Sequence, residues 1–327
     1  MPTIKDVARK AGVSVGTVSR VLAKNDTVKQ PLQLRVQAAM KELEYKPNLA
    51  ARALRTNSID VIGLVVPDIT NPFFAQLAKN IEMEAAKRSH SVMLANSHDD
   101  VETEKTQIAA LLDRAVCGVI VVSTSDGSDL DTADVPVVSL DRRFGAYPLI
   151  ATDHYDGSQK IADHLYELGH RRIAYIAGPL SMDVARRRRE GFVSRIKMLS
   201  TAEDPIELSV HEGQFDYDSG EDIGRKILSE TPVGKRPTAI AAASDQQAIG
   251  VLRCARDLKL DVPGDLSVAG FDDITLASLV VPRLTTLRQP IEALAASAVD
   301  QIFETKTSSD DKAIAGNVVK RESTAPR

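Results

Sequence analysis

The chain has 327 residues, of which 43% are hydrophobic and 26% charged, so it is long enough for two or three domains with sizeable cores. No apolar stretch reaches the length of a membrane span and the N-terminus lacks the apolar core of a signal peptide, so we expect a cytoplasmic protein with no membrane contact. The two cysteines, Cys117 and Cys254, lie in apolar or helical contexts and are predicted to be free buried thiols, and the six histidines show no metal-ligand spacing.

The net charge of −4 conceals an asymmetry along the chain. Residues 1–57 carry 11 Lys or Arg and 4 Asp or Glu, whereas the remainder carries 30 and 41. A basic N-terminal segment on an acidic remainder suits a nucleic-acid-binding arm attached to a domain that avoids nucleic acid.

The opening stretch, TIKDVARKAGVSVGTVSRVL, reads as two short helices joined by a tight turn. Thr3 is placed to cap the first helix, with Asp6 in the acidic position of a capping box. Gly12 supplies the backbone freedom that a sharp turn needs. Ser14 follows the turn and can cap the second helix.

The second helix, expected over residues 15–22, has two different faces. Its inward face is apolar and consists of Val18, Val21 and Leu22. Its outward face carries small or polar groups and one long cation, namely Val15, Gly16, Thr17, Ser19 and Arg20. Such a helix can enter a DNA major groove, so the combination favours a helix-turn-helix over an unspecialised helical hairpin.

A third helix is predicted from about Pro31 to Tyr45 and would complete an all-α head. The opening stretch closely resembles that of the LacI/GalR family of bacterial transcription regulators, and further matches extend over nearly the whole chain. Lys29 and Gln33 stand where the family has a serine cap and an arginine. The predicted DNA-binding residues are Thr3, Ser14, Val15, Gly16, Thr17, Ser19, Arg20, Asn25, Tyr45, Leu54 and Arg55.

Residues 45–58, YKPNLAARALRTNS, resemble the hinge helix of that family, which packs against its dimer mate in the DNA minor groove. An isolated helix of this length is unstable in water, so its order would come from the partner and the DNA. Leu54 matches the apolar wedge that opens a base step, with Arg55 beside it. Taken without the head, the segment would read as an ordinary linker with an exposed leucine.

From Ile59 onward, strands and helices alternate. Strands are expected at 61–68, 91–97, 117–123, 136–141, 172–178, 239–244 and 266–273, and helices at 72–89, 107–116, 158–169, 187–198, 221–230 and 247–258. This alternation implies two doubly wound parallel-sheet α/β halves. Residues 124–136 are short and polar, and we expect a loop or one helical turn there. No glycine-rich phosphate loop follows an early strand, so a nucleotide-dependent enzyme has no support.

The order of motifs resembles the periplasmic sugar-binding fold that the family shares, in which the chain crosses three times between the halves. We place the crossings near Thr152, Val280 and Ser309. The resulting domains are a head over 1–46, a hinge over 47–58, an N-terminal subdomain over 59–152 plus 281–309, and a C-terminal subdomain over 153–280 plus 310–327.

Ligands in open α/β sheets bind at the carboxyl ends of strands. Distinctive side chains lie near those ends in this chain: Asn71, Phe73, Phe74, Asp141, Arg142, Arg188, Phe215, Ser244, Asp272 and Gln289. Carboxylates accept hydrogen bonds from neighbouring hydroxyls, arginines and amides donate them, and aromatic rings cover the apolar side of a sugar. Each residue alone fits a helix cap, a solvated loop or a core, but their recurrence at successive strand ends favours a polyhydroxylated ligand.

All of these residues except Ser244 resemble the ligand set of ribose-binding periplasmic proteins, and Ser244 stands where that set has asparagine. The resemblance implies a homodimeric repressor on a pseudo-palindromic operator, controlled by ribose or a nucleoside, with no cofactor and no metal. A purine corepressor or a phosphoprotein partner is the alternative. A sugar kinase or hydrolase has less support, because no nucleophile–base pair or Walker loop is visible.

Overall fold

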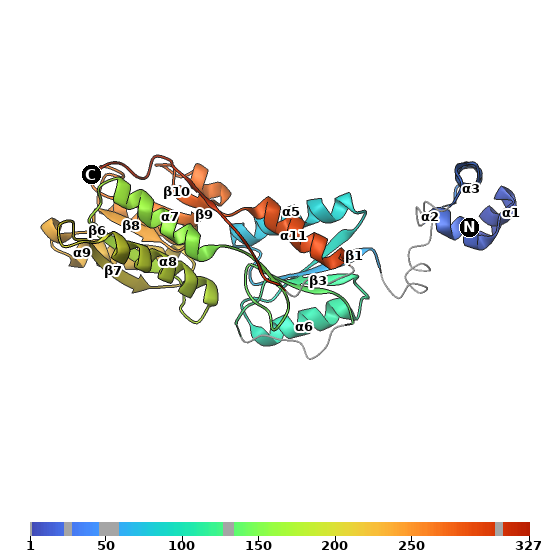
Figure 1. The fold of residues 1–327 in the computed structure, drawn as a ribbon, viewed down its shortest axis with the longest axis horizontal. Coiled ribbons are helices and arrows are strands. Elements are labelled where there is room, and N and C mark those ends of the chain that lie inside the picture. Colours follow the sequence, from blue (N-terminus) through green and yellow to red (C-terminus); the bar gives the residue numbers. More distant parts are fainter. Residues whose placement is uncertain (1, 23–27, 46–58, 127–133, 305–309) are drawn as a thin grey trace. The chain divides into compact units, whose positions relative to one another are not determined.

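The computed structural model describes residues 2–22, 28–45, 59–126, 134–304 and 310–327. The chain divides into two compact units, Met1–Ile59 and Asp60–Arg327, which we call the head and the body (Figure 1). The predicted hinge over 47–58, with Leu54 and Arg55, lies outside the described residues, as does Asn25.

The head contains three helices, α1 (Ile4–Ala11), α2 (Val15–Leu22) and α3 (Gln30–Glu42). The capping box is present as predicted, because the Thr3 hydroxyl accepts from the Asp6 amide and the Asp6 carboxylate accepts from the Thr3 amide at 2.9 Å. Gly12 ends α1 with φ +63°, in the left-handed region that glycine adopts without strain. The helix-turn-helix therefore follows from strong local signals.

Six small or β-branched residues form the buried core of the head, namely Val7, Ala8, Ala11, Val18, Val36 and Ala39. Helix α3 ends at Glu42 rather than at the predicted Tyr45, whose amide donates to the Met40 carbonyl. Lys29 makes no side-chain cap, and the Gln33 amide instead donates to the Val28 carbonyl at 2.8 Å. The start of α3 is thus held by a different contact from the serine cap of the family.

The body has two lobes, each built on a six-stranded sheet. The first lobe contains β1 (Val61–Val66), α5 (Pro72–Lys87), β2 (Ser91–Asn96), α6 (Val101–Leu112), β3 (Gly118–Val121), β4 (Val137–Leu140), β5 (Leu149–Thr152), α11 (Ile291–Phe303) and β11 (Lys312–Ile314). Its strand order is β11-β5-β4-β3-β1-β2, all parallel. Helix α6 packs on one face, and α5 and α11 pack together on the other (Figure 1).

The second lobe repeats this plan. It contains α7 (His154–Glu167), β6 (Arg172–Ala177), α8 (Asp183–Leu199), β7 (Glu207–Glu212), α9 (Tyr217–Glu230), η1 (Val233–Lys235), β8 (Ala239–Ala242), α10 (Asp245–Asp257), β9 (Ser267–Asp272), η2 (Thr275–Ser278), β10 (Thr285–Arg288) and β12 (Asn317–Val319). Its order is β12-β10-β9-β8-β6-β7, with only β12 antiparallel to its neighbour among the described strands. The central strands β8 and β9 are buried throughout, as expected where helices cover both faces.

The second predicted crossing between lobes must be corrected. The first crossing follows β5, which ends at Thr152. The second was placed near Val280, but β10 pairs with β9, so the chain stays in the second lobe until Gln289. Strand β10 has only one apolar residue, Leu287, so it lacks the apolar run by which the four-residue strands β3, β4 and β8 were predicted, and Pro290 follows it closely.

The third predicted crossing, near Ser309, must also be corrected. Strand β11 pairs with β5 of the first lobe, whereas β12 pairs with β10 of the second. The chain therefore changes lobes between Ile314 and Asn317. Both strands have three residues, so the alternation on which the sequence reading relies is absent there.

Several helices begin earlier than their hydrophobic spacing predicts, because an aspartate caps each first turn. Asp100 accepts from the Thr103 amide at 2.7 Å and starts α6 at Val101. Asp153 and Asp216 cap α7 and α9 in the same way. The first turns are polar and carry no apolar period, so a reading based on periodicity misses them. Of the segment 124–136, residues 127–133 lie outside the described part of the chain.

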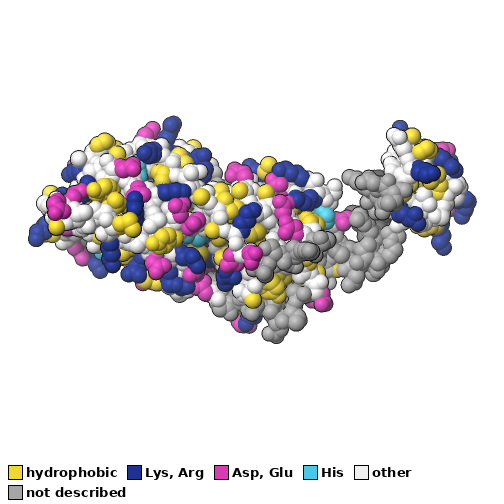
Figure 2. All heavy atoms as spheres, in the orientation of Figure 1, with side chains coloured by type: hydrophobic (Ala, Val, Ile, Leu, Met, Phe, Trp, Pro, Cys, Tyr) yellow, Lys and Arg dark blue, Asp and Glu magenta, His cyan; other side chains and the backbone are white. Residues whose placement is uncertain are grey.

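The surface of the body mixes charges of both signs. In Figure 2, acidic and basic side chains are interspersed over the visible face, with small hydrophobic patches between them. Among the described residues, no helix is both long enough and apolar enough to cross a membrane.

Candidate functional site

The carboxyl ends of the two sheets face a small cavity between the lobes of the body. Its lining includes nine of the ten residues predicted from the sequence: Asn71, Phe73, Phe74, Asp141, Arg142, Arg188, Phe215, Ser244 and Asp272, joined by Val184. The first five come from the first lobe and the others from the second. The cavity has a volume of about 20 Å³, which holds about one water molecule. A larger ligand therefore requires the lobes to move apart.

The aromatic wall of the cavity belongs to α5. Asn71 caps this helix, since its Oδ1 accepts from the Phe73 amide at 3.0 Å. The Phe73 and Phe74 rings are only 4% and 3% exposed and meet edge to face at 5.3 Å. The Arg142 guanidinium lies 5.2 Å from the centre of the Phe74 ring. These residues thus serve the core and the helix cap, and still offer ring edges and one amide group to the cavity.

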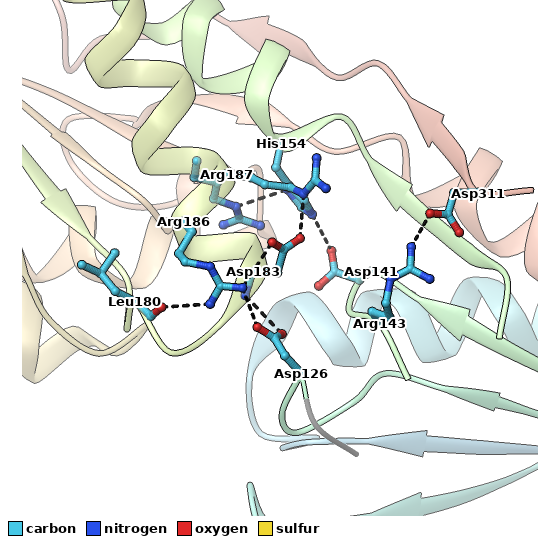
Figure 3. Close-up of polar contacts among 10 residues, drawn as sticks. Asp126, Asp141, Arg143, His154, Leu180, Asp183, Arg186, Arg187 and Asp311 are labelled. Atoms are coloured by element: carbon cyan, nitrogen blue, oxygen red, sulfur yellow. Dashed lines mark hydrogen bonds and ion pairs between the residues drawn. The ribbon is translucent and has the colours of Figure 1, made fainter. Parts of the chain in front are cut away.

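Asp141 supplies the carboxylate of the first lobe. It directly follows β4, is 3% exposed, and has a backbone φ of +61°, which is unusual for a residue with a side chain. Its Oδ1 lies 3.4 Å from Nε2 of His154 (Figure 3). Burial would raise the pKa of Asp141, but His154, Arg188 and Arg142 outweigh this effect and lower it, so the group remains a carboxylate.

Arg188, on α8, is the central cation of the second lobe and is 4% exposed. Its Nη1 donates to the Ala243 carbonyl at 2.6 Å and lies 3.2 Å from Oδ1 of Asp272. The guanidinium also stacks over the Phe271 ring, 3.9 Å from its centre, and lies 5.6 Å from the centre of the Phe215 ring. These contacts hold the planar guanidinium, with its N–H donors, in one orientation at the cavity.

Asp272, at the end of β9, carries the second carboxylate. Burial raises its pKa to about 6, although Arg188 and Gln289 act in the opposite direction. The Gln289 amide donates to Oδ1 of Asp272 at 2.7 Å, and its carbonyl accepts from the Thr152 hydroxyl at 2.6 Å. Gln289 therefore does not line the cavity, but it joins the first two crossings to the carboxylate that does.

Ser244 caps α10 and lines the cavity, whereas Asp245, the first residue of α10, does not line it. The Ser244 hydroxyl accepts from the Gln247 amide at 3.2 Å, so it serves as the helix cap. Asp245 is fully buried and accepts from the Thr286 hydroxyl and the Ile274 amide. Burial and the nearby charge of Asp272 raise its pKa well above the ordinary value.

The sequence reading missed His154, the first residue of α7. It is 3% exposed, and its ring contacts charged groups from both lobes (Figure 3). The available signal was an Asp-His pair directly after a strand, but that strand, β5, has four residues and was not predicted.

The predicted DNA-binding residues of the head divide into two groups. Val15, Gly16 and Arg20 are exposed on α2, with Val15 at 39%. Thr3 and Ser14 act as caps, and the Ser14 hydroxyl accepts from the Thr17 amide at 3.1 Å. Ser19 is half-buried, and Tyr45 packs partly buried against the core of the head. The exposed group forms the face that would enter a groove.

Within the described ranges, no cluster of three or more His, Cys, Asp or Glu residues could hold a metal ion. Cys254 is a buried free thiol as predicted, whereas Cys117 is only half-buried.

Known families match both units of the chain. The model described as bacterial regulatory proteins, lacI family, matches residues 3–48, and the model described as a periplasmic binding protein-like domain matches residues 162–324. The HTH-type transcriptional repressor PurR of Edwardsiella ictaluri is 34% identical over 321 residues, covering 96% of this chain and 93% of that protein. The ribose operon repressor of Escherichia coli is 35% identical over 311 residues, covering 93% and 92%.

A solved structure with a similar fold is that of the Lac repressor dimer bound to operator and the anti-inducer ONPF. It matches with a TM-score of 0.79 and 30% sequence identity, covering 99% of both chains. These similarities therefore extend over the helical head as well as the two lobes.

Proposed function

Because the chain belongs to the LacI family of bacterial regulatory proteins, we propose that it is a repressor whose affinity for operator DNA is set by a sugar bound between the lobes. The favoured ligand is ribose, free or within a nucleoside. The protein acts as a homodimer on a pseudo-palindromic operator in the cytoplasm, and it is not an enzyme. The observation that carries the proposal is the convergence of nine predicted residues on one cavity.

The charges of the cavity favour a sugar over a purine base. Asp141 and Asp272 approach from opposite lobes, and each can accept hydrogen bonds from neighbouring hydroxyls. A purine base donates only through ring N–H and amino groups in one plane, whereas ribose presents hydroxyls on both sides of its ring, which suits carboxylates that approach from opposite lobes. A purine corepressor is nevertheless the rival reading, since a repressor named PurR is as similar to this chain as the ribose operon repressor.

The proposed switch follows from a ligand that touches both lobes. Such a ligand shifts the population toward the lobe orientation that it binds better, by no more than its difference in affinity. In a dimer, a change of lobe orientation alters the spacing of the segments at 47–58 that precede the bodies. We infer that ribose acts as an inducer that releases DNA, whereas a purine corepressor would have the opposite sign.

The experiment is an operator titration with and without saturating ribose, at one salt concentration because DNA affinity depends steeply on salt. We expect ribose to weaken DNA binding by the parent and to leave the Asp272→Ala variant unaffected. A parallel titration with a purine base tests the rival. Ribose that binds without changing operator affinity would refute the coupling, and absence of ribose binding would refute the choice of effector.

A further inference from the structure

We propose that His154 is a positioning residue of the effector cleft, which aligns Asp141 of the first lobe with Arg188 of the second. This inference rests on the proposed function, because it assigns a role within the same cleft. It concerns a residue that does not line the small cavity itself but stands behind two residues that do.

The position of His154 in the chain makes this role possible. It is the first residue of α7, two residues beyond Thr152 at the end of β5, where the chain passes between the lobes. The imidazole is 3% exposed and lies between a loop of the first lobe and helix α8 of the second (Figure 3). The ring therefore contacts both lobes, so its position depends on how the two lobes are arranged.

The contacts of the ring determine its tautomer. Nδ1 lies 3.3 Å from Nε of Arg188, and an arginine nitrogen can only donate, so Nδ1 must accept. The proton of a neutral ring is then on Nε2, which faces Oδ1 of Asp141 at 3.4 Å. Burial and the charge of Arg188 lower the pKa of His154, which favours this neutral form.

Both contacts end on charged groups of the cleft. Oδ1 of Asp141 and Nε2 of His154 have no hydrogen-bond partner among the described residues, and they face each other at 3.4 Å. A buried donor and acceptor left without partners would cost stability, so each of these atoms depends on the other. Removal of the ring would leave the Asp141 carboxylate free to turn away from the geometry that a sugar requires. Arg188 would lose one contact but keep those with Ala243, Asp272 and Phe271.

The other buried histidines of the second lobe behave differently and provide a control. His170 is 1% exposed, and its Nδ1 bonds to the Thr238 hydroxyl at 2.9 Å. Neither His170 nor Thr238 lines the cleft cavity. A His170→Gln variant therefore perturbs an equally buried imidazole without touching Asp141 or Arg188.

Two conservative variants separate the two contacts of His154. The Oδ1 of asparagine lies near the position of Nδ1, so His154→Asn retains an acceptor for Arg188. The amide nitrogen of glutamine reaches the position of Nε2, so His154→Gln retains a donor for Asp141. We expect ribose affinity, measured by calorimetry at pH 7.5, to fall more than tenfold in His154→Ala, by a smaller factor in the Asn and Gln variants, and not at all in His170→Gln.

The outcomes distinguish this inference from the proposed function. If the parent binds ribose and a folded His154→Ala variant binds it equally well, the positioning role is refuted. If His154→Ala does not fold, the Asn and Gln variants carry the same test. If the parent does not bind ribose, the choice of effector is refuted, and the contact is then tested by denaturation of His154→Ala, Asp141→Asn and the double variant. Non-additive midpoints support the contact, and additive ones refute it.

Discussion

Asp272 combines an unfavourable backbone conformation with a buried carboxyl group. Its backbone φ of +122° is unfavourable for a residue with a side chain, and its side chain is 10% exposed. The pKa is near 6 in the folded chain, against 3.8 for the ordinary carboxyl group. Because the folded pKa is raised, the neutral group contributes stability below about pH 4, and this contribution is lost as the pH rises through 6.

The substitution Asp272→Asn replaces the buried carboxylate with a neutral group of the same shape. We expect the free energy of unfolding at pH 7.5 to increase by about 1–3 kcal/mol, since a pKa difference of this size corresponds to that range. This gain in stability should vanish near pH 4, and thermal unfolding at pH 7.5 and pH 4 measures it. Ribose binding by the variant should be lost at neutral pH.

The neighbouring Asp273 gives a control of opposite sign. Its carboxylate pairs with Arg288 at 2.6 Å and with Arg321 at 2.5 Å. Asp273→Asn should therefore lower stability at pH 7.5. An unchanged melting temperature for Asp272→Asn at pH 7.5 would mean that ionisation of Asp272 carries no cost.

For single residues, the sequence predicts which side chains lie at the site better than it predicts which side chains contact one another. Asp141 and Asp272 could be predicted because the carboxyl ends of parallel strands meet at one edge of a sheet whatever the details of packing. His154 could not be chosen, because its role depends on contacts with residues 13 and 34 positions away that only the packed lobes bring together. Gln289 was predicted to bind the effector, but it does not line the cavity and donates to Asp272 instead.

At the scale of elements, the first lobe supplies the missing cap of a helix in the second. Helix α8 has no side-chain cap of its own at Met182. The carboxylate of Asp126, after β3, accepts from the Asp183 amide at 3.2 Å and pairs with Arg186 at 2.7 Å (Figure 3). An anion at a helix N-terminus is favourable, so this contact stabilises the lobes in the orientation seen.

The substitution Asp126→Ala removes both the cap and the ion pair. We expect the free energy of unfolding to fall by about 1 kcal/mol. Most of this loss comes from the helix cap, because an exposed ion pair contributes little to stability. Because the cavity in this orientation holds about one water molecule, ribose needs the lobes to move apart, and loss of this contact should lower the dissociation constant of ribose severalfold. Arg187→Ala is the control, since Arg187 pairs with Asp183 of its own helix. Equal affinity in Asp126→Ala and the parent would show that the contact does not affect closure.

The recognition helix gives a second test on a single element. Arg20 is the long cation on the exposed face of α2. Arg20→Ala should weaken operator binding by about 1–3 kcal/mol if the contact is a bidentate pairing with a base edge. Arg9→Ala is a matched control, because Arg9 is an exposed arginine that pairs with Asp6 on α1. A salt-controlled titration that finds no change for Arg20→Ala would remove it from the interface.

Helices and strands can be predicted from the sequence where neighbouring residues alone determine them. The cap at Thr3 and the turn at Gly12 define the head, because each requires only a few adjacent residues. The strands β5, β10, β11 and β12 have three or four residues each and are placed only by their partners. Since β10, β11 and β12 decide where the chain changes lobes, two subdomain boundaries could not be read correctly from the sequence.

At the scale of the whole molecule, the charge distribution separates DNA binding from ligand binding. The N-terminal 57 residues are basic and the remainder is acidic, so the body repels the phosphate backbone that the head attracts. The lobes of the body are linked across their gap by contacts such as that of the Gln76 amide oxygen with the Thr275 amide at 2.8 Å.

Leu54, which lies outside the described residues, tests the proposed role of the segment at 47–58. Its resemblance to the apolar wedge of the family motivates the prediction that Leu54→Ala keeps ribose binding and dimerisation but loses most operator affinity and DNA bending. Leu34→Ala is the control, because Leu34 is a leucine of the head that is 59% exposed on α3. Binding and bending are measured together by gel mobility on circularly permuted operator fragments. If Leu54→Ala bends the operator as the parent does, the apolar residue does not open a base step, and the cleft must act on DNA through the spacing of the two heads alone.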